Sequence, residues 1–362
     1  MLFHVGALWR LNEAGYLPRL ARISSVSGGS ITAGRLALAW PALSFGPDGV
    51  ARRFEDEVVV PIRRTASVTI DWKAAIAGLL LPGRTAGGEL ARWYAKLLFN
   101  GATLQDLPDR PRFIFNAANL QTGSLFRFSK PYMADYHIGM IEKPMVALAT
   151  AVAASSAFPP VLSPLRLPLD FAHFTPDSRL DLQRQPFTRM AVLTDGGVYD
   201  NFGLETVWKR LRTVLISDGG QKMGPVERPS GHWLSQIYRV LQLTDNQVRS
   251  LRKREVIKEF IADAQSRIST DADSAEPRGT YWGMTTNISD YGLSDTLPCP
   301  SDLTSELAQI RTSLSALEPQ VQEKIIDWGY AVCDAAMRRY IDPSLASPHG
   351  FPFPSVWPSS SH

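Results

Sequence analysis

The chain has 362 residues, 44% hydrophobic and 20% charged, which is the composition of a globular protein with a large core. Its formal net charge of +3 is too small to indicate a nucleic-acid-binding protein. No run reaches the roughly 18 apolar residues of a spanning helix, and no signal peptide is visible, so we expect a cytoplasmic or peripheral membrane protein. The only cysteines, Cys299 and Cys333, lack the spacing of zinc ligands, which predicts free thiols and no metal site or cofactor.

The first elements in chain order indicate an α/β protein. Apolar residues recur at helical spacing over residues 2–14, and Gly15 ends this run. A short β-prone segment at 22–27 leads into a helix over 30–43 that is apolar or small nearly all round. Because such a helix is normally buried, a strand followed by it is typical of an α/β layer fold. Residues 49–107 are expected to be mostly helical.

The middle of the chain contains further strands and one ambiguous segment. Residues 72–81 are the most apolar stretch and predict a core helix, with a lid or membrane-facing segment as the alternative. Two adjacent strands are expected at 112–120 and 124–128. An alanine-rich helix over about 145–155 follows, and the proline-rich residues 161–189 predict a loop.

Two later strands each end on an aspartate followed by two glycines, at Asp195 and at Asp218. In open α/β sheets, sites form at the carboxyl ends of strands, so both aspartates are candidates. A helix is expected between them, over 203–211, and a weak strand near 281–286. The basic run 249–254 predicts a solvated helix face, with contact to anionic lipid as the alternative.

The sequence predicts three parts. The first is a catalytic domain over residues 1–220, and the second is a helical extension packed on it over residues 221–343. Two late helices, over about 303–317 and 321–340, fall within that extension. The proline- and serine-rich residues 344–362 predict a disordered tail.

A serine stands at an expected strand–turn–helix corner near the N-terminus. Ser27 follows the strand, and Gly28 and Gly29 supply the turn before the helix. The stretch matches the nucleophile elbow G-x-S-x-G, with Ser25 in place of the first glycine. On this stretch alone a structural turn or a phosphate-binding loop is an equal alternative, although the lysine and glycine spacings of such loops are missing from it.

Three motifs in order carry a family resemblance: the serine elbow, the block Ala154-Ser-Ser-Ala-Phe-Pro-Pro160, and Asp195-Gly-Gly with Asn201 soon after. Over roughly residues 1–220 the chain resembles the patatin-like phospholipase family. The resemblance implies a three-layer α/β/α fold with a mainly parallel central sheet whose first strand is missing here. It also implies a lipid acyl hydrolase that uses a Ser-Asp dyad, needs no cofactor and contacts membranes peripherally. Oligomeric state is not indicated.

By position, the resemblance makes Ser27 the nucleophile and Asp195 the base that takes its proton, which leads to an acyl-enzyme on a lipid or acyl-ester substrate. The backbone N–H of Gly28 would contact the oxyanion. The remaining motif residues are expected to support this geometry: Ser25, Gly29, Gly196, Gly197 and Asn201. Asp218 is the rival base, but the turn and asparagine that follow Asp195 do not follow Asp218.

Two alternatives accompany this interpretation. The resembled family carries a glycine-rich oxyanion loop upstream of its first helix, whereas this chain begins inside that helix. Either the natural start lies further upstream, or the chain is a catalytically impaired lipid-binding or scaffold member. A Ser-His-Asp triad with His232 would keep the order of an α/β-hydrolase. In that fold, however, several strands precede the elbow, so the order of the motifs excludes the triad.

Overall fold

The structure is a computed structural model, and it describes residues 1–69, 85–177, 180–269, 277–310 and 315–357. The apolar stretch 72–81 lies outside the described residues. Two compact units divide the chain: Met1 with Pro18–Val207 form the first, and Leu2–Leu17 with Trp208–His362 form the second. The division at residues 207 and 208 therefore differs from the expected boundary at 220, and the first helix belongs with the second unit.

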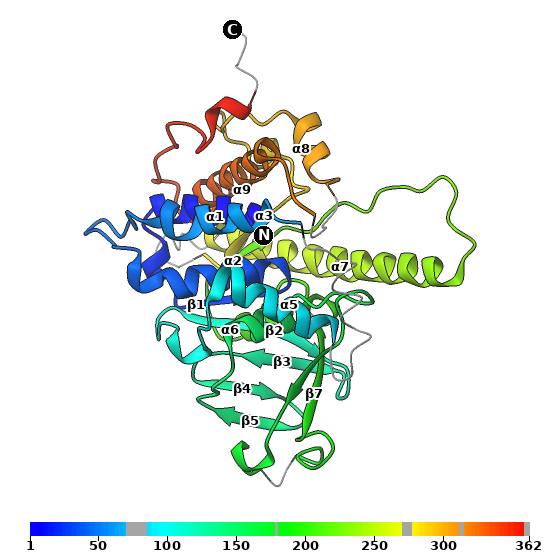
Figure 1. Cartoon of the computed structure of the whole chain (residues 1–362). Helices are drawn as coiled ribbons and strands as arrows, with labels where there is room; N and C mark the ends of the chain where they lie inside the picture. Colours follow the sequence, from blue (N-terminus) through cyan, green and yellow to red (C-terminus); the bar gives the residue numbers. More distant parts are fainter. Residues whose placement is uncertain (70–84, 178–179, 270–276, 311–314, 358–362) are drawn as a thin grey trace. The chain divides into compact units, whose positions relative to one another are not determined.

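The first unit is built on one seven-stranded sheet (Figure 1). Its strands are β1 (Arg22–Ser25), β2 (Arg112–Asn119), β3 (Ser124–Phe128), β4 (Tyr132–Asp135), β5 (Gly139–Glu142), β6 (Leu165–Pro168) and β7 (Met190–Asp195). They follow the order β5-β4-β3-β2-β7-β6, and β1 also pairs with β2. The expected strands at 22–27, 112–120 and 124–128 are present, while β4, β5 and β6 were not predicted.

The expectation of a mainly parallel sheet is wrong. Only β1 and β2 run parallel, and every other pair in this sheet is antiparallel. The cause is the length of the connections, since β2 to β5 follow one another through tight turns, which join only antiparallel neighbours. A parallel pair needs a crossover, and the helical chain between β1 and β2 supplies the one that is present.

Helices of the first unit form a layer on this sheet. They are α2 (Gly28–Ala39), α3 (Val60–Ala66), α5 (Ala86–Tyr94) and α6 (Leu148–Ser155). Helices α2, α5 and α6 contact strands of the sheet, and α6 also contacts both of the others. Strand β2 is buried at every position after its first, because it lies in the middle of the sheet under these helices. The centre of this unit's core is therefore β2.

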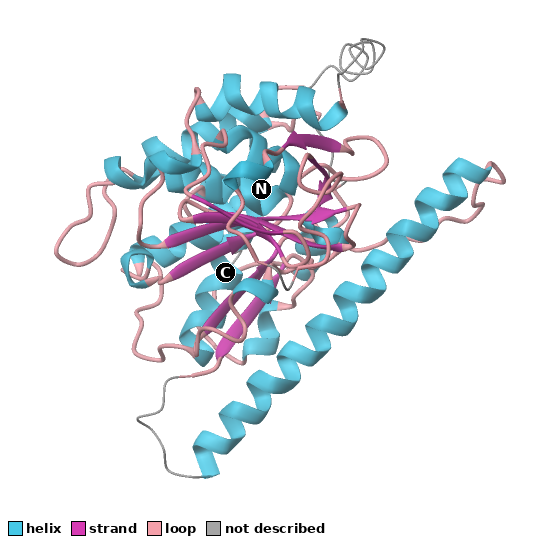
Figure 2. Cartoon of the chain, turned by 90° about the horizontal axis from the view of Figure 1, so that it is seen from below, coloured by secondary structure: helices cyan, strands magenta, loops and turns pink. Residues whose placement is uncertain are grey.

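The second unit combines long helices with a short parallel strand pair. Its elements are α1 (Leu2–Glu13), β8 (Val214–Asp218), α7 (Trp233–Ser269), β9 (Gly279–Gly283), α8 (Ser301–Leu307) and α9 (Pro319–Tyr340). The 37-residue α7 is the long diagonal helix of Figure 2. Helices α1 and α9 touch at backbone level, because a Cβ atom at Gly6 would lie 1.8 Å from the Ile326 carbonyl oxygen. Asp334 of α9 pairs with Arg10 at 2.8 Å and with Arg338 at 2.9 Å.

Three local expectations in the second half of the chain are wrong. The helix expected over about 303–317 ends at Leu307 in α8. The helix expected over 203–211 is only a 3₁₀ turn at Leu204–Thr206, since Ser24 of β1 bonds to the Gly203 carbonyl at 2.6 Å and fixes a non-helical path. The tail over 344–357 is packed on α9 rather than disordered. Trp357 is buried there, and its indole N–H donates to the Asp327 carboxylate at 2.9 Å. Residues 358–362 lie outside the described part.

None of the described helices is both long enough and apolar enough to span a bilayer. Helix α7 has the length, but its charged residues interrupt every apolar run.

Both cysteines are expected to resist alkylation in the native protein. Burial raises the pKa of the Cys299 thiol to about 12, and the charge of Asp327 adds to the effect. Burial also raises the pKa of Cys333, which has no exposed surface. At pH 8 only about one Cys299 in 10⁴ is then a thiolate, the reactive form. Iodoacetamide at pH 8 should leave both thiols unmodified until denaturant is added, as measured by intact-protein mass spectrometry; rapid alkylation of the native chain would contradict this burial.

Candidate active site

Ser27 occupies a strained backbone position between β1 and α2. Its φ of 52° and ψ of −132° are unusual for a residue other than glycine and cost about 1–3 kcal/mol. The surrounding turn holds this conformation: the Gly29 N–H donates to the Val26 carbonyl, and the Ser30 N–H donates to the Ser27 carbonyl, both at 2.9 Å. Ser27 is half-buried, and such strain at a strand–turn–helix corner is typical of a nucleophile elbow.

The strand register brings the ends of β1 and β7 together. On one edge of β2, Phe115 pairs with Ser25 of β1 and Ala117 pairs with Asp195 of β7. On the other edge of β2, both residues pair with β3. Strands β1 and β7 therefore lie on the same edge of β2 and point their carboxyl ends at each other. Their last residues are two β2 positions apart, which corresponds to about 7 Å. Ser27 and Asp195 both belong to this meeting point within one unit.

Gly196 fills the gap between the two strand ends. A Cβ atom at this position would lie 2.1 Å from the Asn116 carbonyl oxygen and 2.5 Å from the Val26 side chain. Only glycine permits so close an approach, because the Asn116 oxygen belongs to the rigid backbone of β2. The glycine after Asp195 therefore sets how closely the aspartate approaches the elbow.

Asp195 is held in a buried position with 1% of its surface exposed. Its carboxylate Oδ1 accepts a 2.7 Å hydrogen bond from the Gly197 N–H, and its own N–H donates to the Ala157 carbonyl at 3.0 Å. Burial and the nearby Asp195 charge raise the pKa of Tyr94, whose hydroxyl lies 3.2 Å from the Ser156 hydroxyl. The Tyr94 hydroxyl is therefore protonated, neutral and close to the carboxylate.

Ser155 links three elements around the elbow. Its hydroxyl donates to the Asn116 carbonyl at 2.6 Å and lies 2.8 Å from the hydroxyl of Ser30 in α2. Its carbonyl accepts the N–H of Ser27 at 3.0 Å. The Ser30 hydroxyl also donates to the Ser25 hydroxyl. Ser25, which replaces the first glycine of the elbow motif, therefore belongs to this buried chain of hydroxyls. Sequence reasoning interpreted Ser155 as a helix-terminating and wall-forming residue and missed this positioning role.

Asn116 is a second residue that sequence reasoning missed. It is fully buried in β2, and its amide donates to the Ser24 hydroxyl at 2.8 Å and to the Ser25 carbonyl at 3.0 Å. These bonds tie the end of β1 to β2 directly before the elbow. The signal in the sequence was a lone polar residue inside the apolar run Phe113-Ile-Phe-Asn-Ala117, because buried polar groups normally have partners.

The turn after Asp195 is organised by Asp200. Its buried carboxylate accepts hydrogen bonds from the Glu205 N–H at 2.8 Å and from the Phe202 N–H at 3.3 Å. Asn201 lies half-buried in the same turn. Asp200 therefore has a structural role here.

The rival candidates Asp218 and His232 belong to the second unit, whereas Ser27 belongs to the first. Asp218 accepts hydrogen bonds from the Tyr281 hydroxyl at 2.7 Å and from the Gly220 N–H at 2.8 Å. His232 is exposed just before α7. Within the described ranges, His, Cys, Asp and Glu side chains form no group of three that could hold a metal ion.

A comparison with known protein families identifies the family of this chain. The family model described as patatin-like phospholipase matches residues 1–208, which is more than half of the chain and includes Ser27 and Asp195. No curated protein was found to match the chain. The matched region contains the β-sheet and helices of the first unit together with α1. The chain therefore belongs to the patatin-like phospholipase family, which has an α/β fold and whose members are lipid hydrolases.

Proposed function

We propose that this protein is a serine lipid acyl hydrolase in which Ser27 and Asp195 act as a dyad. The observation that carries the proposal is the convergence of β1 and β7 on one edge of β2, with the strained Ser27 at one strand end and the buried Asp195 at the other. A carboxylate can activate a serine without histidine when both are held together in a sheltered position.

The reaction follows from these positions. Asp195 takes the Ser27 proton as Oγ attacks the ester carbonyl carbon, and the Gly28 N–H at the start of α2 stabilises the oxyanion. The tetrahedral intermediate collapses, the alcohol leaves with the proton from Asp195, and an acyl-enzyme remains. Asp195 then takes a proton from water as the water oxygen attacks the acyl carbon. When this second tetrahedral intermediate collapses, Asp195 returns the proton to the Ser27 Oγ, and the fatty acid and free Ser27 are released. Every step uses protein groups and water, so no cofactor is required.

The family membership supports a lipid acyl ester as the substrate class. Long-chain acyl esters reside in bilayers, so we expect peripheral contact with membranes rather than a spanning segment. Phospholipids, lysophospholipids and acylglycerols all present the ester group that the dyad attacks.

A fluorophosphonate probe tests the nucleophile directly, because it forms a covalent bond only with an activated serine. We expect labelling of the native chain at Ser27, together with hydrolysis of p-nitrophenyl esters, and loss of both in Ser27→Ala. Ser67→Ala, which removes an exposed hydroxyl of the same unit, should label as the native chain does. If the folded native chain neither labels nor hydrolyses any ester, the hydrolase proposal is wrong, and vesicle binding would then identify a lipid-binding or scaffold member.

A further inference from the structure

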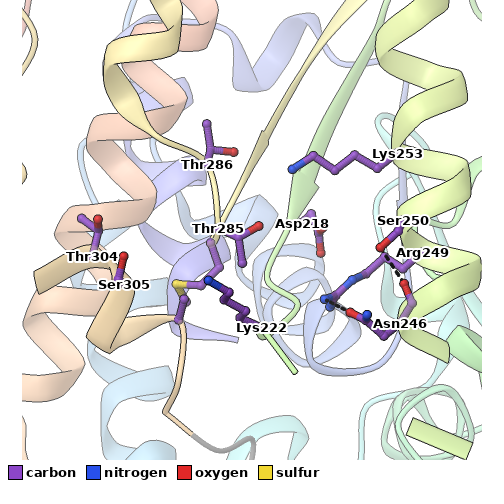
Figure 3. A pocket seen from close by; sticks show the side chains of 12 residues that line it. Asp218, Lys222, Asn246, Arg249, Ser250, Lys253, Thr285, Thr286, Thr304 and Ser305 are labelled. Atoms are coloured by element: carbon purple, nitrogen blue, oxygen red, sulfur yellow. Dashed lines mark hydrogen bonds between the residues drawn. The ribbon is translucent and has the colours of Figure 1, made fainter. Parts of the chain in front are cut away.

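A polar pocket of about 290 Å³ lies within the second unit (Figure 3). Its lining comes from the end of β8 and the residues after it, the middle of α7, the segment after β9, and α8. Arg249 and Lys253 stand one helical turn apart on α7, and Thr304 and Ser305 of α8 lie across the pocket from them. Both cations come from the basic run that the proposed hydrolase reaction does not use.

The lining carries an excess of positive charge. Three cations, Lys222, Arg249 and Lys253, face a single carboxylate, Asp218. The Asp218 carboxylate accepts hydrogen bonds from the Tyr281 hydroxyl and the Gly220 N–H, and neither of these donors is charged. Among the residues that the structure describes, none of the three cations forms an ion pair with a carboxylate. The lining therefore carries two more positive charges than negative ones.

The two cations on α7 are held in place before any ligand binds. Arg249 donates to the Gln221 carbonyl and lies 3.4 Å from the Asn246 side-chain oxygen. Its guanidinium packs so tightly on Gly220 that a Cβ atom there would be 1.6 Å from Nη1. The Lys253 ammonium lies 4.8 Å from the centre of the Tyr281 ring. Such prior ordering reduces the entropy that binding would cost.

Lys253 would gain from a nearby anion. Burial lowers its pKa, opposed by the charge of Asp218, so the charged ammonium is destabilised where it stands. A bound anion would offset this cost. Hydroxyl groups of Thr285 and Ser305, both exposed, supply further donors around the pocket.

We propose that this pocket binds a phosphate-bearing anion through Lys222, Arg249 and Lys253. A phosphate monoester carries about −1.5 to −2 charges near neutral pH, which matches the excess positive charge of the lining. Arginine and lysine together with hydroxyl donors are the usual protein contacts of phosphate oxygens. The pocket is at the small end of ligand sites and is polar, so it suits a headgroup-sized anion and not an acyl chain. The proposal is independent of the proposed hydrolase function.

The phosphate could belong to a free small molecule or to a lipid headgroup. The first turns of the same helix expose Trp233, Ile237 and Val240 at the spacing of one helix face, which would suit a bilayer beside an anionic headgroup. The shared chemistry is the phosphate, and two arms of one experiment separate the sources.

The first arm titrates inorganic phosphate into the full chain by calorimetry at fixed ionic strength, with chloride as the control anion. We expect saturable binding that weakens at least tenfold in Lys222→Gln and in Arg249→Gln. Lys222 is exposed, so its replacement should leave the fold intact. Lys258→Gln, an exposed lysine of α7 outside the pocket, should bind phosphate as the native chain does.

The second arm measures cosedimentation with vesicles of phosphatidylcholine alone or with phosphatidic acid. Loss of binding to phosphatidic acid in Lys222→Gln but not in Lys258→Gln would identify a lipid headgroup as the source. Binding in the first arm alone would identify a soluble phosphate compound. If neither arm depends on Lys222 or Arg249, or if Lys258→Gln weakens binding equally, the pocket is no phosphate site and the proposal is wrong.

Discussion

Asp195→Asn is expected to lower kcat for ester hydrolysis by about 10⁴, and adding Ser27→Ala to it should cause almost no further loss. Asparagine keeps the size of the aspartate and can still accept the 2.7 Å hydrogen bond from the Gly197 N–H, so the fold should survive. It cannot take the serine proton, and without that step the hydroxyl remains a poor nucleophile. When two residues act as one catalytic unit, removing either one already lowers kcat nearly as much as removing both, so the two decreases in kcat do not add.

The measurement is kcat and KM on a soluble acyl ester for both single variants and the double variant. The matched control is Asp170→Asn, which changes an exposed aspartate of the same unit at the N-cap of the 3₁₀ turn Phe171–His173, where asparagine serves equally well. Its kcat should be unchanged. Independent losses, with the double variant far below each single one, would mean that Asp195 does not act through Ser27.

Gly196→Ala is expected to destabilise the protein by about 3 kcal/mol and to abolish activity. The added Cβ atom would meet the Asn116 carbonyl oxygen and the Val26 side chain at distances no real contact allows. Relief requires β7 to withdraw from β2, which breaks the register that places Asp195 opposite Ala117. The urea midpoint followed by circular dichroism measures the stability, and fluorophosphonate labelling measures the site.

Gly197→Ala is the matched control for this effect. A Cβ atom at residue 197 would lie 3.0 Å from the Asp195 Oδ1, which is a side-chain atom, and would meet no backbone atom at short distance. We expect little loss of stability, so any loss of activity in this variant would come from the carboxylate itself. Equal urea midpoints for Gly196→Ala and the native chain would show that the strand ends are not packed as described.

Several elements could be read from the sequence because their signals are local. Helix α1 stood out by apolar periodicity, strand β2 by its run of apolar residues, and α2 by its apolar and small residues. The four-residue strands β4, β5 and β6 were missed, whereas the equally short β1 was found because the elbow motif follows it. Strand direction was misjudged because alternation within a strand does not report its neighbour's direction, which the connecting turns decide.

The sequence alone determined the order of the elbow, the Ala-Ser-Ser block and the Asp-Gly-Gly motif, and with it the family, because motif residues are neighbours along the chain. Tertiary structure alone decided the partners that are far apart in sequence. It aligned β1 and β7 end to end on β2, placed Gly196 against Asn116, and made Ser155 the link between α2, α6 and β2. These contacts depend on pairing register and close packing, which arise only when distant segments meet and which no local pattern encodes.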